Sequence, residues 1–171
     1  MLNVNYANRG KSLESLINYA NQQYLSKRVA LVQHIPTDWT VIRRGTQIIS
    51  AFPTQKSTVD YIGITSFNGE TVPLAFDAKQ CMQKTSFPLS NIEQHQLDYL
   101  TGWESPGGTS FFIVEMLALR KIFRVELSEV MQYWLVAEAG GRKSIPLEDF
   151  DKFQVVGQGG GIVLDYLGVY S

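Results

Sequence analysis

Residues 57–80 read STVDYIGITSFNGETVPLAFDAKQ and predict two paired strands at the centre of the domain. Two β-rich runs flank Asn68 and Gly69, and Asn-Gly is the strongest short hairpin signal because both residues tolerate the positive φ of a type I′ turn. A two-residue turn fixes the register, so counting back along both strands sets Asp60 opposite Asp77. Their Cβ atoms are then about 5 Å apart on one face of the sheet.

This acid pair needs a positive partner. Two carboxylates so close on a half-buried sheet repel each other and are costly to desolvate. Lys79 lies on the same face as Asp77 because side chains alternate along a strand. A cation between Asp60 and Asp77 would complete the compensation, and oxygen-only ligation favours Mg²⁺ or Mn²⁺ over zinc. The alternative is a solvent-facing strand with an ordinary Lys–Asp surface pair, and a bulge at Pro73 would shift the register.

The composition predicts one ordinary globular domain over residues 1–171. The chain is 44% hydrophobic and 18% charged, with a formal net charge of −1, which argues against a histone-like nucleic-acid binder. A single cysteine, Cys81, excludes an internal disulfide, and two histidines beside it argue against structural zinc. The N-terminal run lacks the apolar core of a signal peptide, and no run approaches the about 18 apolar residues of a membrane span. We therefore expect a cytoplasmic protein.

The hydrophobic periodicity predicts an α/β or α+β domain with a mixed central sheet flanked by helices. A helix is expected over 11–26, strands over 28–35, 109–117 and 121–127, a helix over 128–139 and a short helix within 144–153. Residues 38–57 read as a hairpin, of which about 38–55 form an insertion that projects from the body. Ser90 with Glu93 three residues later forms a capping box and predicts a helix that begins at Ser90. On that helix Gln96 interrupts an apolar stripe, so it is either a functional side chain or a hydrogen-bonded core residue.

Several short strings together resemble one nuclease family. They are N-R-G at 8–10 followed by Leu13-Glu14, S-T-V-D-Y at 57–61, F-D-A-K at 76–79, and K-T-S-F-P-L-x-N-x-x-x-H-Q over 84–96. An aspartate on one strand and D-x-K on the next resemble the PD-(D/E)xK nuclease core. The full set, in this order, resembles the RecU family of Holliday junction resolvases from Gram-positive bacteria and some of their phages. The resemblance implies a restriction-endonuclease-like fold.

The resemblance also implies roles for the matching residues. Asp60 and Asp77, with the Ala78 carbonyl, would ligate Mg²⁺, for which Mn²⁺ substitutes. Lys79 would orient or activate the attacking water. The remaining catalytic residues would be Glu14 and Gln96, although an acid in the first turn of a helix is also favoured by the helix dipole.

Two positions depart from the family pattern. Asp77 stands where bacterial relatives carry a glutamate, and Val59 stands where they tend to carry a hydroxyl residue. Neither change removes a charge, so we expect activity to be altered in degree rather than in kind.

DNA contacts and a homodimer are implied in the same way. The projecting hairpin corresponds to the stalk of RecU proteins, which reaches into a four-way junction, and Trp39 or Phe52 would offer stacking surfaces. The candidate DNA-binding residues are Arg9, Lys11, Arg43, Arg44, Lys56 and Thr85. The alternative for the hairpin is a solvated loop whose charges serve solubility. Symmetric cleavage needs two active sites related by a two-fold axis, so we expect a homodimer; a recombinase partner is not readable.

Three functions therefore remain open from the sequence. The first is a Mg²⁺-dependent Holliday junction resolvase acting in DNA recombination and repair. The second is a less selective branched-DNA or restriction-type nuclease on the same core. The third is a weakly catalytic protein that binds junctions without cutting them.

Overall fold

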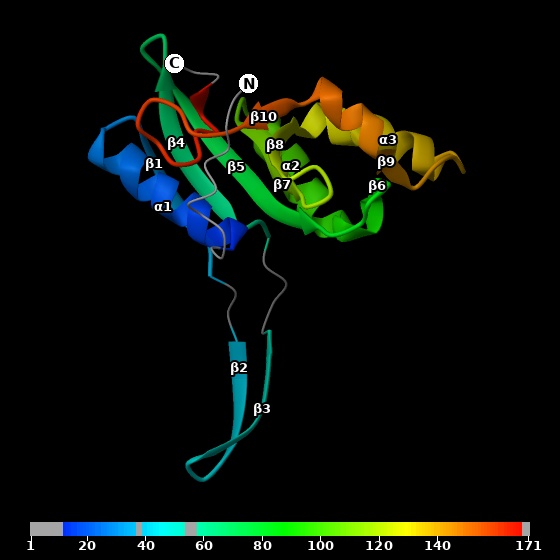
Figure 1. Ribbon diagram of the computed structural model, residues 1–171. Coiled ribbons are helices and arrows are strands. Elements are labelled where there is room, and N and C mark those ends of the chain that lie inside the picture. The colour runs from blue at the N-terminus through cyan, green and yellow to red at the C-terminus, as the bar shows by residue number, and fades with distance from the viewer. Residues whose placement is uncertain (1–11, 37–38, 54–57, 169–171) are drawn as a thin grey trace.

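The computed structural model describes residues 12–36, 39–53 and 58–168 (Figure 1). The predicted contacts of Arg9, Lys11 and Lys56 lie outside these residues, and so do the side chains of Trp39 and Phe52. The helices are α1 (Leu13–Ser26), η2 (Leu89–Asn91), α2 (Gln94–Glu104), α3 (Leu127–Glu138) and η3 (Leu147–Lys152). The strands are β1 (Ala30–His34), β2 (Trp39–Arg44), β3 (Gln47–Pro53), β4 (Tyr61–Phe67), β5 (Glu70–Cys81), β6 (Ser86–Pro88), β7 (Thr109–Met116), β8 (Lys121–Glu126), β9 (Ser144–Pro146) and β10 (Gln154–Val156). Within this part of the chain, no helix is long and apolar enough to cross a membrane.

The central sheet is mixed, as the sequence predicted. Its six strands run in the order β1-β4-β5-β7-β8-β10, with β5 and β7 parallel and the other neighbours antiparallel. The β4–β5 hairpin turns at Asn68 and Gly69, whose φ angles are 50° and 81°. Phe67 pairs with Glu70, and the register continues without a shift to Tyr61 opposite Phe76. The predicted register is confirmed, and Pro73 is accommodated opposite Ile64 without a bulge.

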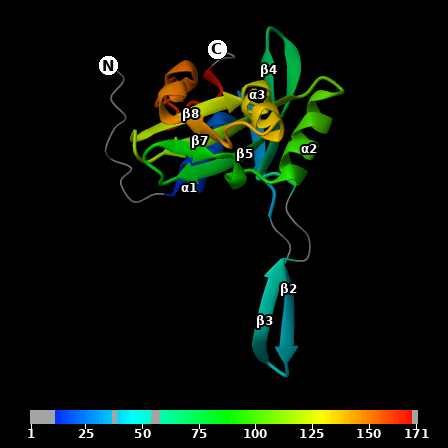
Figure 2. The same ribbon diagram turned by 90° about the vertical axis from the view of Figure 1, so that its right-hand side faces the viewer.

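Helices cover both faces of the sheet (Figures 1 and 2). On one face, Leu74 and Phe76 of β5 pack in a core cluster with residues of α1. On the other face, Ala75 packs in a second cluster with residues of α2 and α3. Because alternate residues of β5 face the two clusters, Asp77 points to the α2 side of the sheet and Ala78 to the α1 side.

The β2–β3 hairpin projects away from this body, and both views show it standing clear of the sheet and helices (Figures 1 and 2). Within the described part of the chain its strands pair only with each other, and the register shifts between Ile42 and Arg43. Arg43 and Arg44 are exposed near its tip, where Gly45 turns the chain with a φ of 64°. The hairpin predicted within 38–57 is therefore confirmed.

The predicted helix start at Ser90 is wrong. Residues Leu89–Asn91 form one 3-10 turn, and Ile92 is extended with φ −108° and ψ 127°, so α2 begins four residues later, at Gln94. Ile92 is 3% exposed and packs into the core, and burying that side chain requires the break. The actual cap is Glu93, and the backbone N–H of Glu93 donates to Gln96 Oε1 at 3.0 Å.

An aromatic stack crosses the α1 face of the sheet beside the strand ends that carry the two aspartates. Tyr61 stacks on Phe76 with centroids 4.8 Å apart, and Phe76 stacks on Phe111 at 4.7 Å. The guanidinium of Arg124, on β8, lies 3.9 Å from the Phe111 centroid and closes the far end. This arrangement fixes Tyr61 and Phe76, the residues adjacent to Asp60 and Asp77.

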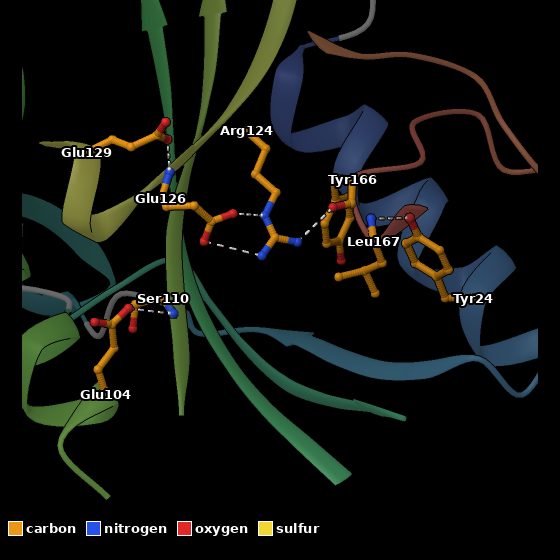
Figure 3. Close-up of polar contacts among 8 residues, drawn as sticks. All are labelled: Tyr24, Glu104, Ser110, Arg124, Glu126, Glu129, Tyr166 and Leu167. Carbon is orange, nitrogen blue, oxygen red and sulfur yellow. Dashed lines mark hydrogen bonds and ion pairs between the residues drawn. The ribbon is translucent and has the colours of Figure 1, made fainter. Parts of the chain in front are cut away.

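Arg124 also ties the C-terminal segment to the sheet (Figure 3). The side chain is 2% exposed, donates to Glu126 Oε1 at 2.6 Å and donates to the Tyr166 carbonyl at 3.1 Å. The hydroxyl of Tyr24 accepts from the Leu167 N–H at 3.0 Å and donates to Asp165 at 2.8 Å. Residues 165–167 are thereby held across α1 and β8.

Candidate active site

Asp60 and Asp77 meet just before the start of β4. The Ala78 N–H donates both to Asp60 Oδ2, at 2.9 Å, and to Asp77 Oδ1, at 3.0 Å. Two carboxylates that share one donor lie side by side, so the predicted pairing of the two acids is confirmed. β4 begins at Tyr61, so its backbone does not reach the Ala78 N–H on the neighbouring edge of β5. The two carboxylates accept that N–H in place of a backbone carbonyl of β4.

Asp77 carries a strongly shifted pKa. The residue is fully buried, and burial together with the neighbouring Asp60 carboxyl raises the pKa of Asp77 to about 8, against the lowering effect of Lys79. Among the described residues its Oδ2 atom accepts no hydrogen bond, and its contact there is the ion pair with Lys79 Nζ at 3.1 Å. Without a further cation, a buried pair of this kind holds a proton at neutral pH.

Lys79 is held between Asp77 and α2. Its ammonium donates to Gln96 Oε1 at 3.0 Å, and its side chain is 16% exposed. The same Gln96 oxygen accepts the Glu93 N–H, so one amide both closes the start of α2 and orients the lysine. Gln96 is 8% exposed, which agrees with its position on the inward stripe of the helix. The structure therefore brings together Asp60, Asp77, Lys79 and Gln96.

Glu14 lies apart from that group. It is exposed in the first turn of α1, and the described residues contain no set of three or more His, Cys, Asp or Glu side chains close enough to hold a metal ion. Its charge still reaches the site: burial raises the pKa of the Tyr61 hydroxyl well above its usual range, and Glu14, Asp60 and Asp77 raise it further. All three acids therefore act on the pKa of this phenol, although Glu14 is exposed and lies outside the acid pair.

The acid pair fits a small divalent cation. It offers carboxylate oxygens, among them the unbonded Oδ2 of Asp77, and such hard donors suit Mg²⁺ or Mn²⁺. The N–H and C=O of one strand residue point to the same neighbouring strand, so the Ala78 carbonyl is directed toward the edge where Asp60 lies. These three groups are the ones that could hold the ion.

The candidate DNA-binding residues that the structure describes lie elsewhere. Arg43 and Arg44 are on β2, in the hairpin that projects from the body (Figure 1). Thr85 is exposed in the connector before β6, and its carbonyl accepts the Leu147 N–H at 3.1 Å.

The sequence pattern did not single out Tyr61. Its side chain is fully buried beside the acids, and its hydroxyl has no hydrogen bond in the described part of the chain. The available signal was its position directly after Asp60, in the S-T-V-D-Y string. A strand pattern alone assigns such a residue to the core.

A mixed sheet with an aspartate pair and a lysine at the end of two antiparallel strands defines the PD-(D/E)xK class of nuclease folds. Within that class the chain belongs to the RecU family, because the family model described as "Recombination protein U" matches residues 8–171.

Relatives across the family have the same name. A protein of Pediococcus pentosaceus is 39% identical over 153 residues, covering 86% of this chain and 74% of that protein. A protein of Leuconostoc mesenteroides is 36% identical over 171 residues, covering 96% of this chain and 81% of that protein. Both are named "Holliday junction resolvase RecU". A solved structure of Archaeoglobus fulgidus Hjc, described as a Holliday junction resolvase, has a TM-score of 0.46 at 6% identity and covers 81% of this chain and 94% of that chain.

Proposed function

We propose that this chain is a Mg²⁺-dependent endonuclease that resolves Holliday junctions by paired, symmetric hydrolysis of phosphodiester bonds. The observation that carries the proposal is the shared donor: Asp60 and Asp77 both accept the Ala78 N–H, with Lys79 3.1 Å from Asp77. Membership of the RecU family and the names of the relatives support the choice of a four-way junction as substrate.

The residues of the site take separate roles in this proposal. Asp60, Asp77 and the Ala78 carbonyl would hold Mg²⁺, and the ion would supply Lewis-acid polarisation of the scissile phosphate and of water near neutral pH. Lys79 orients the attacking water and offsets negative charge on the phosphoryl oxygens. Gln96 keeps the Lys79 ammonium in place, because the Gln96 amide oxygen accepts a hydrogen bond from Lys79 Nζ at 3.0 Å. Glu14 completes the acidic set from α1.

The projecting hairpin is proposed to enter the junction. Arg43 and Arg44 are exposed on it, and two guanidinium groups beyond the body suit phosphate contacts. Further DNA contacts are proposed for Arg9, Lys11, Lys56 and Thr85. Paired nicks across a two-fold symmetric junction require two copies of the site, so we propose a homodimer. Residues 1–171 would then act as one nuclease domain with a stalk-like insertion at about 38–55, in the cytoplasm where the chromosome is recombined.

One cleavage experiment separates this function from its alternatives. A mobile four-way junction and a linear duplex of the same sequence are each incubated with the protein, with Mg²⁺ and with chelator. A resolvase gives paired symmetric nicks on the junction only, and only with Mg²⁺. Cutting of both substrates indicates the less selective nuclease, and binding without nicks indicates a junction-binding protein.

A further inference from the structure

The hydroxyl of Tyr61 is a buried polar group without a partner. The side chain has no exposed surface, and its oxygen makes no hydrogen bond to the described residues. Buried hydroxyls are rarely left in this state, since the great majority find a protein or water partner. Two other tyrosines of the same core cluster follow that rule: the Tyr24 hydroxyl bonds to Asp165 and Leu167, and the Tyr166 hydroxyl bonds to Asn21.

The ring of Tyr61 cannot turn to find a partner. One face stacks on Phe76 at 4.8 Å with an interplanar angle of 10°, and His34 packs against the ring edge-on at 5.2 Å. A hydrogen bond to this hydroxyl therefore requires another side chain to move toward Tyr61.

Glu14 is placed to be that partner. It lies three residues before Ile17, at the edge of the buried stripe of α1, so its side chain starts beside the sheet-facing side of the helix. Leu13 and Ile17, its neighbours on the first turns, share the core cluster of Tyr61.

The other two acids near Tyr61 are already engaged. Asp60 Oδ2 and Asp77 Oδ1 accept the Ala78 N–H, and Asp77 Oδ2 faces Lys79 from the α2 side of the sheet. Glu14 is exposed in the first turn of α1, where its carboxylate can reorient.

We propose that Tyr61 is a positioning residue: its hydroxyl donates a hydrogen bond to the Glu14 carboxylate and holds Glu14 against the acid pair when the site binds its divalent cation. This inference rests on the proposed metal site. It explains why a fold that packs its other core tyrosines with bonded hydroxyls leaves this one open. It also explains how a third acid joins a site that has two in the structure described here.

The experiment compares Tyr61→Phe with Tyr24→Phe, its matched control, in the full chain. Each change removes one buried hydroxyl from the same cluster. We measure thermal unfolding without metal, and Mn²⁺ affinity by calorimetry. Tyr61→Phe is expected to leave Tm unchanged or higher while weakening Mn²⁺ binding about tenfold, which corresponds to about 1.4 kcal/mol. Tyr24→Phe is expected to lower Tm, because its hydrogen bonds are lost, and to leave Mn²⁺ affinity unchanged.

A double-mutant cycle with Glu14→Gln then tests the named partner. If the hydroxyl acts through Glu14, the double variant binds Mn²⁺ no more weakly than Glu14→Gln alone. Three results would each overturn the role of Tyr61. The first is additive losses in the cycle, and the second is a Mn²⁺ affinity of Tyr61→Phe within about twofold of the unaltered chain. The third is a drop in the Tm of Tyr61→Phe as large as the drop for Tyr24→Phe. Failure of the unaltered chain to bind Mn²⁺ would instead overturn the proposed metal site, and this role with it.

Discussion

Replacing Asp77 by asparagine should stabilise the metal-free protein while abolishing cleavage. The side chain is fully buried, and its pKa is raised from 3.8 to about 8, chiefly by burial and by Asp60. An acid whose folded-state pKa lies above its unfolded value contributes stability that is complete below the unfolded pKa and is lost progressively as pH rises from the unfolded pKa through the folded pKa. Asparagine cannot ionise, so the variant does not suffer this loss.

The magnitude follows from the two pKa values. At pH 7 an unfolded aspartate is ionised, whereas Asp77 in the fold still holds most of its proton, and this difference costs the native state about 4 kcal/mol. Water entering at the strand end and relaxation of Lys79 reduce that cost, so we expect Asp77→Asn to raise the free energy of unfolding by about 2–4 kcal/mol. The gain should shrink as pH falls from 7 toward 4.

The assay is urea denaturation at pH 7 and pH 5 in the presence of chelator, repeated with Mg²⁺. Asp98→Asn is the control, since Asp98 is an exposed acid on α2 that accepts from Gln94 at 2.8 Å, and a change there should stay within about 0.5 kcal/mol. Mg²⁺ should stabilise the unaltered chain and not Asp77→Asn. A metal-free Asp77→Asn protein that is less stable than the unaltered chain at pH 7 would refute the reasoning.

Three further changes test other parts of the account. Lys79→Ala should lower the rate of junction cleavage by at least about 100-fold while metal-free junction affinity stays largely intact, and a near-normal rate would remove the lysine from the site. Replacing both Arg43 and Arg44 by alanine should weaken junction binding and reduce the slope of log affinity against log salt by about 2, whereas an unchanged slope would return the hairpin to a solubility role. Arg124→Met should lower the free energy of unfolding by about 3 kcal/mol in urea, because removal of the buried guanidinium leaves Glu126 and the Tyr166 carbonyl without this donor; a loss under about 1 kcal/mol would show that the two contacts are dispensable.

The sequence predicted the β4–β5 hairpin because its information is local. Asn68 and Gly69 adopt the positive φ angles that the turn requires, and a two-residue turn leaves no freedom in register. Two predictions that depend on this register are confirmed: Asp60 lies beside Asp77, and Asp77 and Lys79 share one face.

The start of α2 was missed because tertiary packing overrode a local signal. Ser90 and Glu93 satisfy a capping-box pattern, yet Ile92 must be extended to reach the core, so the box forms later between Glu93 and Gln96. With this later helix start, Gln96 also contacts Lys79. A helical hydrophobic pattern does not predict that contact.

The open hydroxyl of Tyr61 was also beyond the sequence. Burial of a tyrosine after Asp60 is readable from strand alternation, but the absence of a bond within the described residues depends on Phe76 and His34 fixing the ring. The short strands β6, β9 and β10 were missed for another reason: three residues are too few to show a period-two hydrophobic pattern.

The most direct test of a cation held by Asp60 and Asp77 is anomalous scattering from crystals of this protein soaked in Mn²⁺. One strong peak is expected beside the start of β4, within about 2.2 Å of carboxylate oxygens from both Asp60 and Asp77. A peak that touches neither carboxylate, or no peak between them at saturating Mn²⁺, would contradict the shared cation site.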